Sequence, residues 1–303
     1  MEALMSPSTS FLVLIPTFNH PGTVEFAIRS ALQQTLTEVH VAVVGDGVSE
    51  RTRAIVGRLT REDRRLRFYD FPKSVSHGEE HRDRIIRELS PDYVTYLGDD
   101  DLLLPHHCEV MLDSLRKADF VHPQPVYIGQ DGQVHSFFRT DLRVDLSLEW
   151  HMHFPWQNSI SLTGATHTLE AYLSLNEGWT STPPNRWSDH FMWQKFFTTK
   201  GLRFTTSPLS TTMKFRARPL SEEEQVRQIR YFFQRLSHQD FLAEWDHTVA
   251  TTVSRENVEA FIERRRLRRE LQEAIKEIEI LRGEATLAVS SAATRDARNS
   301  KLS

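Results

Sequence analysis

Short apolar runs alternate with amphipathic stretches along the first 130 residues of the chain. The predicted strands occupy residues 11–18, 39–47, 66–71 and 92–97. The first of them is a continuous apolar run, as expected of a strand that is covered on both faces of a sheet. The amphipathic stretches carry apolar residues at helical spacing and predict helices. They occupy residues 23–34, 49–59, 78–89 and 104–115. Strands joined by helices predict βαβ units, and hence an α/β fold with a mostly parallel sheet flanked by helices.

The second half of the chain follows a different pattern. Residues 130–219 are rich in aromatic side chains and histidine and show no clear period, whereas helical spacing dominates from Ser221 onward. After Gly283 the residues are small, polar and mixed in charge, a composition typical of disorder. The expected organisation is therefore a main domain over residues 1–220, a helical C-terminal extension over 221–283 and a disordered tail over 284–303.

The extension carries apolar residues in a four-three alternation, which fits a short coiled coil. They are Leu267, Leu271, Ala274, Ile278 and Leu281. Such a segment would join copies of the chain into a homo-oligomer through residues 267–281. The alternative is a solvated helix that lies on its own domain.

Three consecutive carboxylates follow the fourth predicted strand, at Asp99, Asp100 and Asp101. Ligands of parallel sheets collect at the carboxyl ends of the strands. Thr17, Asp46 and this acidic turn are therefore expected in one crevice. Hard oxygen ligands suit Mg²⁺ or Mn²⁺, which usually keep positions open for phosphate oxygens. The alternative is a solvated acidic turn in which Asp101 caps the next helix.

Composition narrows the classes of function. The formal net charge of −4 provides no global basic field, so no nucleic-acid partner is expected. The single cysteine, Cys108, cannot form an internal disulfide. No apolar run approaches the roughly 20 residues that a membrane helix needs, and the N-terminus lacks the pattern of a signal peptide. A cytoplasmic protein with no membrane span is the expectation.

Five stretches, in order, resemble motifs of the family 2 glycosyltransferases of GT-A fold, the nucleotide-diphospho-sugar transferases. They are VLIPTFN at 13–19, VVGDGVSE at 43–50, YLGDDDLLLP at 96–105, RWSDHFMW at 186–193 and KFRARPLS at 214–221. The resemblance implies a GT-A, Rossmann-like fold over the main domain.

The resemblance also implies a role for each motif residue. It assigns donor-nucleotide binding to Thr17, Asp46, Arg82 and Asp99. It assigns a Mn²⁺ or Mg²⁺ cofactor to Asp100 and Asp101. Lys214, Arg216 and Arg218 are expected to bind the diphosphate, as arginine forks suit phosphate oxygens.

Asp189 is implied as the catalytic base of an inverting reaction. It stands near a helix N-terminus, a position that favours its ionised form and weakens its basicity. Its alternative role is that of a helix cap.

The chain departs from the family pattern at three motif positions. Gly98 stands where the commonest form of the family's metal-binding motif has its first aspartate. Which of the remaining aspartates binds metal and which binds the ribose is therefore open, and Asp101 either binds metal or caps the helix. Ser188 stands where the family usually has glutamate, so Asp189 carries the role alone. Arg218 occupies the usual histidine position, where it can pair with diphosphate but cannot bind metal.

The expected function is that of a metal-dependent, inverting glycosyltransferase of the hexosyltransferase type. It would move a sugar from a nucleotide-sugar, with a UDP-sugar as the first choice, to a glycan, lipid-linked or protein acceptor. Four tryptophans are expected to line the acceptor-binding site, and packing in the core or in a lid is the alternative for each. They are Trp150, Trp156, Trp179 and Trp187. A catalytically degenerate GT-A module that acts in binding or assembly is one alternative. A nucleotidyltransferase is another, disfavoured because no lysine-bearing loop follows the first strand.

Overall fold

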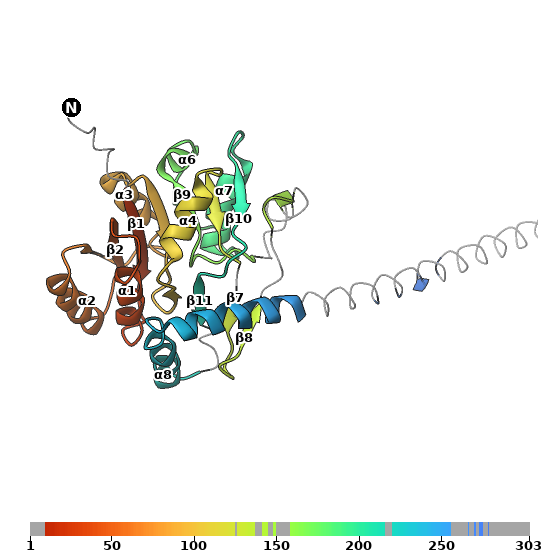
Figure 1. Cartoon of the computed structure of the whole chain (residues 1–303). Helices are drawn as coiled ribbons and strands as arrows, with labels where there is room; N and C mark the ends of the chain where they lie inside the picture. The colour runs from red at the N-terminus through yellow and green to blue at the C-terminus, as the bar shows by residue number, and fades with distance from the viewer. Residues whose placement is uncertain are drawn as a thin grey trace, which may run out of the picture. The chain divides into compact units, whose positions relative to one another are not determined.

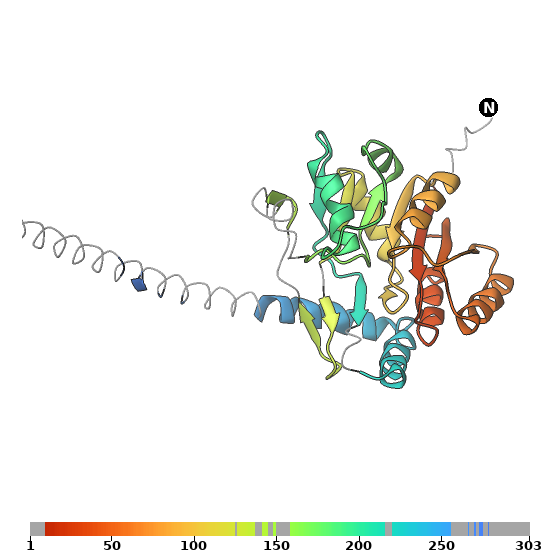
Figure 2. The ribbon, with the colours of Figure 1, turned by 180° about the vertical axis from the view of Figure 1, so that it is seen from behind.

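The computed structural model describes residues 10–124, 126–136, 141–144, 148–149, 158–215 and 220–255, together with residues 266, 270, 273, 274 and 278. Its centre is a seven-stranded sheet with the strand order β10-β6-β9-β4-β1-β2-β3 (Figures 1 and 2). The strands are β1 (Phe11–Thr17), β2 (Val39–Asp46), β3 (Leu66–Phe71), β4 (Tyr93–Tyr96), β6 (Phe120–His122), β9 (Thr166–Thr168) and β10 (Phe204–Thr206). β9 runs antiparallel to both β4 and β6, whereas the other pairings are parallel. The predicted α/β fold with a mostly parallel sheet is confirmed.

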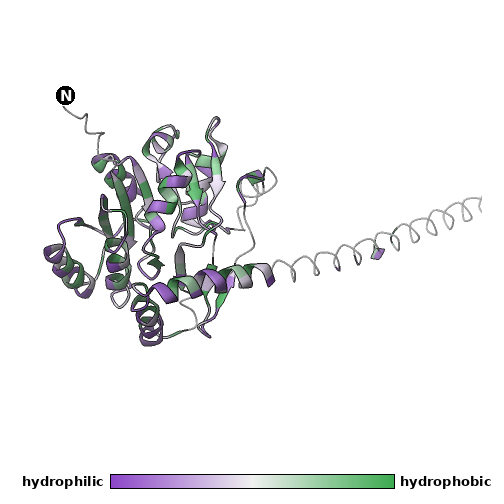
Figure 3. Ribbon diagram, viewed as in Figure 1, coloured by the Kyte–Doolittle hydropathy of each residue, from purple (hydrophilic) through white to green (hydrophobic). Residues whose placement is uncertain are grey.

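Each face of this sheet has its own apolar core because side chains alternate along a strand. On β1, Phe11, Val13 and Ile15 pack on one face, whereas Leu12 and Leu14 pack on the other. The first face is covered by α1 (Val24–Leu32), α2 (Glu50–Glu62) and α4 (His107–Leu115). The second is covered by α3 (Glu79–Leu89), α6 (Leu169–Leu173) and α7 (Ser188–Thr198). Figure 3 shows β1 and β2 as predominantly hydrophobic and α2 as mixed, the pattern of a strand buried between helix layers.

A second, smaller sheet has the order β5-β11-β7-β8. Its strands are β5 (Leu102–Leu103), β11 (Thr212–Phe215), β7 (Val126–Ile128) and β8 (Val134–Ser136). β5 directly follows the acidic turn and pairs with β11, so this sheet brings Lys214 beside Asp101. Sequence periodicity did not predict these short strands.

A third apolar cluster joins the small sheet to the C-terminal helices. It contains Met213 of β11, Phe232 of α8 (Glu222–Phe233), and Trp245 and Val249 of the helix over residues 239–255. Met1–Val253 form one compact unit and Ser254–Ser303 another. The first unit therefore continues past residue 220 and includes α8.

Most of the predicted coiled coil lies outside the described residues. Ala274 and Ile278 are described, and both are helical. The predicted tail over 284–303 also lies outside them. Among the described residues, no helix is long and apolar enough to span a membrane.

Candidate functional site

The carboxyl ends of β1, β2 and β4 meet at one edge of the main sheet. The parallel register sets Thr17 of β1 opposite Gly45 of β2, one residue before Asp46. Across the other side of β1, the Thr17 hydroxyl donates a 2.6 Å hydrogen bond to the Asp99 carboxylate. The structure thus brings the first two predicted motifs and the acidic turn together.

Asp99 is held by the segment that follows β1. Its second carboxylate oxygen lies 2.8 Å from Nδ1 of His20, and its backbone carbonyl accepts a hydrogen bond from Thr23. The hydrogen bond to Asp99 is the largest influence that raises the pKa of His20, to about 9, and the Asp100 and Asp101 charges add to it. The imidazolium of His20 therefore offsets part of the acidic turn's charge at neutral pH.

Asp101 is bound on both carboxylate oxygens by protein groups. Oδ2 accepts from the Thr163 hydroxyl at 2.5 Å and lies 3.3 Å from Nζ of Lys214, while Oδ1 accepts from the Phe215 backbone N–H at 2.9 Å. Asp101 is 1% exposed. These contacts fasten the acidic turn to β11.

Asp100 lies between these two anchored carboxylates. Among the described residues, the Gln225 amide donates to its Oδ2 at 3.4 Å. Burial and the Asp101 charge raise the pKa of Asp100 to about 7, although Lys214 acts in the opposite direction. Asp100 is thus the acid of the turn with the weakest protein partner, and a cation beside it would relieve its repulsion from Asp101.

The acidic turn fits a divalent cation through Asp100. Carboxylate oxygen is the ligand type that Mg²⁺ and Mn²⁺ prefer, and both ions are commonly bound by one or two carboxylates plus phosphate oxygens and water. The described residues contain no cluster of three or more acidic, histidine or cysteine side chains arranged as a complete metal site. A cation at Asp100 would therefore need ligands from a bound diphosphate.

Asp46 is fixed by the loop between β3 and α3. The Lys73 ammonium lies 2.5 Å from Oδ2, and Ser74 donates through its backbone N–H, at 2.5 Å, and its hydroxyl. Burial acts to raise the pKa of Asp46, but these donors outweigh it and hold the pKa below its usual range. Gly78 adopts φ +75°, and a Cβ there would lie 3.1 Å from the Asp46 side chain. The close approach therefore suits glycine.

Arg82 is buried with unused donors. It is 3% exposed, donates through Nη1 to the His77 carbonyl at 3.0 Å and lies 4.2 Å from the centre of the Trp179 ring. Its Nε and Nη2 have no hydrogen-bond partner among the described residues. Burial lowers the pKa of Arg82, and the charges of Glu79, Asp189 and Asp46 oppose that effect. A buried guanidinium with free N–H groups is suited to an anionic or hydroxyl-bearing ligand.

Asp189 stands in the first turn of α7 and accepts a hydrogen bond from the His190 backbone N–H at 2.8 Å. Burial raises its pKa above the ordinary value, and His190 and Lys214 only partly offset that effect. The expectation that the helix terminus would favour ionisation was wrong about the net direction, because loss of hydration outweighs the nearby donors. A raised pKa increases the basicity of this carboxylate.

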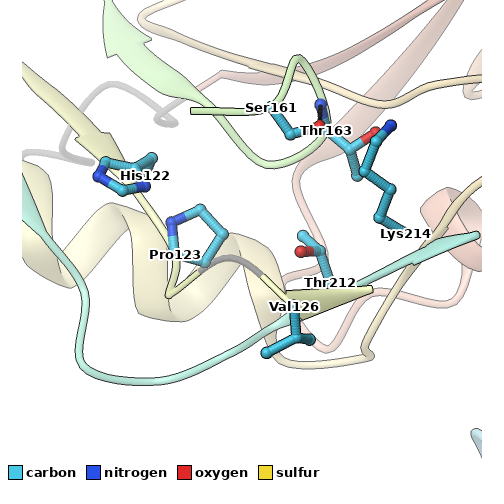
Figure 4. Close-up of a pocket in the computed structure, with 7 residues that line it drawn as sticks. All are labelled: His122, Pro123, Val126, Ser161, Thr163, Thr212 and Lys214. Carbon is cyan, nitrogen blue, oxygen red and sulfur yellow. Dashed lines mark hydrogen bonds between the residues drawn. The ribbon is translucent and has the colours of Figure 1, made fainter. Parts of the chain in front are cut away.

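Lys214 interacts electrostatically with both the acidic turn and Asp189. Its pKa is raised, first by Asp101 and also by Asp100 and Asp189. It borders a cavity of about 10 Å³, the size that one water needs, together with Thr163 and Pro123 (Figure 4). Arg216 and Arg218 lie outside the described residues.

The aromatic residues predicted as acceptor walls differ in exposure. Trp179 is buried under Arg82, which fits its packing alternative, whereas Trp187 is 53% exposed immediately before α7. Trp150 and Trp156 lie outside the described residues.

Sequence reasoning missed several residues that shape the site. His20 was interpreted only as part of a turn, and Lys73, Ser74 and Thr163 lie in segments with no motif. Phe18 is 49% exposed beside Lys73, whose ammonium lies 5.0 Å from the Phe18 ring centre. Phe18 could have been predicted from the sequence, because it directly follows Thr17, the residue at the end of β1 that was expected to bind the donor. The other contacts join segments far apart in the chain and had no local signature.

Comparisons with known proteins place this arrangement in context. Residues 12–157 match the model of "Glycosyl transferase family 2". A β-1,3-glucosyltransferase of Campylobacter jejuni that acts on GalNAc(5)-diNAcBac-PP-undecaprenol is 29% identical over 92 residues, which is 30% of this chain and 30% of that protein. An uncharacterized glycosyltransferase of Rickettsia typhi is 27% identical over 206 residues, which is 63% of this chain and 60% of that protein. The matches thus cover less than two thirds of the length of these curated relatives.

Solved structures share the fold. TarS from S. aureus aligns with a TM-score of 0.55 and 14% identity, over 76% of this chain and 44% of TarS. A structure of TarS residues 1–349 with UDP-GlcNAc aligns with a TM-score of 0.54 and 14% identity, over 81% of this chain and 72% of that one.

Proposed function

We propose that the chain, whose residues 12–157 match the model of glycosyltransferase family 2, belongs to that family and transfers a sugar from a nucleoside diphosphate sugar to an acceptor hydroxyl. The observation that carries this proposal is the single edge of the sheet where Thr17, Asp46 and the acidic turn meet, with Asp100 the least engaged of the three acids. A UDP-sugar is the proposed donor, and the TarS structures with UDP and UDP-GlcNAc support that choice.

The nucleoside would occupy the crevice beside Asp46. Phe18 offers an exposed ring on which the base can stack, and Asp46 is held ionised as a hydrogen-bond acceptor. Arg82 supplies the unused Nε and Nη2 donors. Asp99, anchored by Thr17 and His20, is proposed to face the ribose.

The diphosphate would lie over the acidic turn. Of the two residues assigned to metal, Asp100 is the proposed ligand of Mn²⁺ or Mg²⁺, and Asp101 is the proposed anchor that fastens the turn to β11. Such a cation would neutralise the negative charge that develops on the departing diphosphate. Lys214 contributes positive charge from β11, and Arg216 and Arg218 remain proposed diphosphate contacts.

The proposed reaction is a single inverting displacement. The acceptor oxygen forms a bond to the anomeric carbon as that carbon's bond to the diphosphate oxygen breaks. Asp189 removes the proton of the acceptor hydroxyl, a role that its raised pKa favours. The electron pair of the broken bond leaves with the nucleoside diphosphate.

The test is a donor-binding and turnover screen on the full chain. We expect UDP to raise the unfolding temperature more with Mn²⁺ than without it, and one UDP-sugar to release UDP in the presence of Mn²⁺. A folded protein that binds no nucleoside diphosphate and turns over no nucleotide sugar would contradict the proposal and favour a non-enzymatic module. Release of pyrophosphate would instead indicate a nucleotidyltransferase.

A further inference from the structure

A cavity with a mixed polar and apolar lining lies outside the acidic crevice, at the carboxyl ends of β6 and β10. It has a volume of about 260 Å³. Gln124 lies two residues after the last residue of β6, and Thr206 and Ser207 stand at the end of β10. The helix over residues 239–255 provides the opposite wall through Val249, Ala250 and Val253. Parallel strands place their ligands at this edge of a sheet.

Two buried side-chain atoms of residues that line this cavity have no hydrogen-bond partner among the described residues. Gln124 is 6% exposed and Ser210 is 4% exposed. The amide nitrogen Nε2 of Gln124 and the hydroxyl of Ser210 make no hydrogen bond to any described residue. A buried polar group without a hydrogen-bond partner is unfavourable, so two in one cavity indicate a ligand or water that completes their hydrogen bonds. Trp245 donates to the Ser210 backbone carbonyl at 3.2 Å, which fixes this part of the wall.

The charges around the cavity disfavour an anionic ligand. Arg143 lines it, but its guanidinium is paired with Asp141 through contacts of 2.8 and 2.7 Å. The remaining charged residue of the described lining is Asp246, a carboxylate. Phosphate would therefore meet no uncompensated cation there. A neutral ligand with hydroxyl groups would find a donor amide, a hydroxyl and a carboxylate.

The aliphatic wall adds a second requirement. Pro208, Val249, Ala250 and Val253 add apolar surface to the lining of the cavity. Sugar rings combine a hydroxylated edge with C–H faces, and a largely apolar wall with a few placed polar groups is how small-molecule sites recognise such ligands.

We propose that this cavity binds a neutral sugar unit of the acceptor. The proposal rests on the proposed function, because it identifies the acceptor of that reaction as a glycan. β6 lies two places from β4 in the sheet order, which puts the cavity ~10 Å along the sheet from the strand that leads into the acidic turn. Pro123, the neighbour of Gln124, borders the small hollow that also contains Lys214 (Figure 4). The bound unit would thus be remote from the hydroxyl that receives the sugar.

The experiment uses saturation-transfer NMR on the full chain without donor. The probes are the methyl glycosides of glucose, galactose, N-acetylglucosamine and N-acetylgalactosamine, and inorganic phosphate is added as an anionic competitor because it has no carbon-bound protons to observe. We expect at least one glycoside to bind and phosphate not to displace it. Gln124→Leu and Ser210→Ala should each lower the affinity for that glycoside by roughly tenfold or less, because each removes one hydrogen bond.

Two controls separate recognition from folding. Because the Gln124 amide nitrogen has no partner, Gln124→Leu should not lower the unfolding temperature of the free protein. Gln33→Leu alters a glutamine that lines a different hollow, between α1 and α2, and should leave glycoside binding unchanged.

The outcomes distinguish failure of the proposed sugar-binding cavity from failure of the proposed glycosyl transfer. No glycoside binding by a protein that binds UDP with Mn²⁺ would overturn the cavity proposal alone, as would an unchanged glycoside affinity in both variants or displacement of the glycoside by phosphate. Glycoside binding that both variants weaken, in a protein that binds no nucleoside diphosphate, would keep the sugar site and overturn the proposed glycosyl transfer.

Discussion

At the scale of single residues, the three neighbouring aspartates have different environments. Asp99 is held by Thr17 and His20, and Asp101 by Thr163, Lys214 and the Phe215 backbone. Asp100 has one weak amide contact. The three consecutive aspartates therefore have two roles. Asp99 and Asp101 anchor the turn, whereas the Asp100 carboxylate is available to a ligand.

Asp101→Ala tests the anchoring role. Removing this carboxylate leaves the Phe215 N–H and Lys214 without their acceptor, so we expect the free energy of unfolding to fall by about 3 kcal/mol. Chemical denaturation measures the change. Asp100→Ala is the matched control, and it should leave stability unchanged or raise it by removing repulsion. Equal destabilisation by both substitutions would contradict the division of roles.

Asp189→Asn tests the base. The amide cannot accept the proton, so we expect kcat to fall by about 10²–10⁴-fold while UDP binding is retained. The wild-type rate should also decline as the pH falls through the raised pKa of Asp189, because only the ionised carboxylate is a base. The decline should begin at a higher pH than an ordinary aspartate would produce. A kcat profile that stays flat down to the ordinary aspartate range would rule out Asp189 as the titrating base.

At the scale of elements, local pattern predicted the first half of the chain well. The predicted strand over 66–71 coincides with β3, and the predicted helix over 78–89 differs from α3 by one residue at its start. These elements are regular because each is buried by its neighbours on a repeating α/β plan. The antiparallel strand β9 and the small sheet were not predicted, since strands of two to four residues carry too few positions to show a period.

The residues of the candidate site also differ in whether local sequence could predict them. Residues at strand ends, such as Thr17, Asp46 and Asp99, could be predicted because the topology fixes where strands end. His20, Lys73 and Thr163 could not, because each meets its aspartate across a long stretch of chain. The raised pKa of Asp189 also depends on burial that no local sequence displays.

Helix α8 begins with a capping box in which the Ser221 hydroxyl accepts from Glu224 N–H and the Glu224 carboxylate accepts from Ser221. We expect Ser221→Ala to lower the free energy of unfolding by about 1 kcal/mol, because α8 packs into the first compact unit through Ile229 and Phe232. Thermal unfolding with Ser237→Ala as the exposed control checks this. No difference between the two variants would mean that α8 unfolds separately from the unit.

At the scale of the whole molecule, the compact unit over Met1–Val253 contains every described residue of the proposed site. The segment over 267–281 is predicted to join copies of the chain. Removing residues 264–303 should therefore lower the solution mass to that of a monomer, as measured by sedimentation, with donor binding intact. An unchanged mass would refute self-association through this segment and leave the catalytic proposal as it stands.

The most direct test of the account is a calorimetric titration of UDP into the full chain, with and without Mn²⁺, for the wild type and Asp100→Asn. We predict that Mn²⁺ tightens UDP binding to the wild type by at least tenfold and that Asp100→Asn loses this gain while it unfolds at or above the wild-type temperature. Binding of UDP that is equally tight with and without Mn²⁺, or a gain that Asp100→Asn retains, would contradict the claim that the acidic turn holds the donor's diphosphate through a cation.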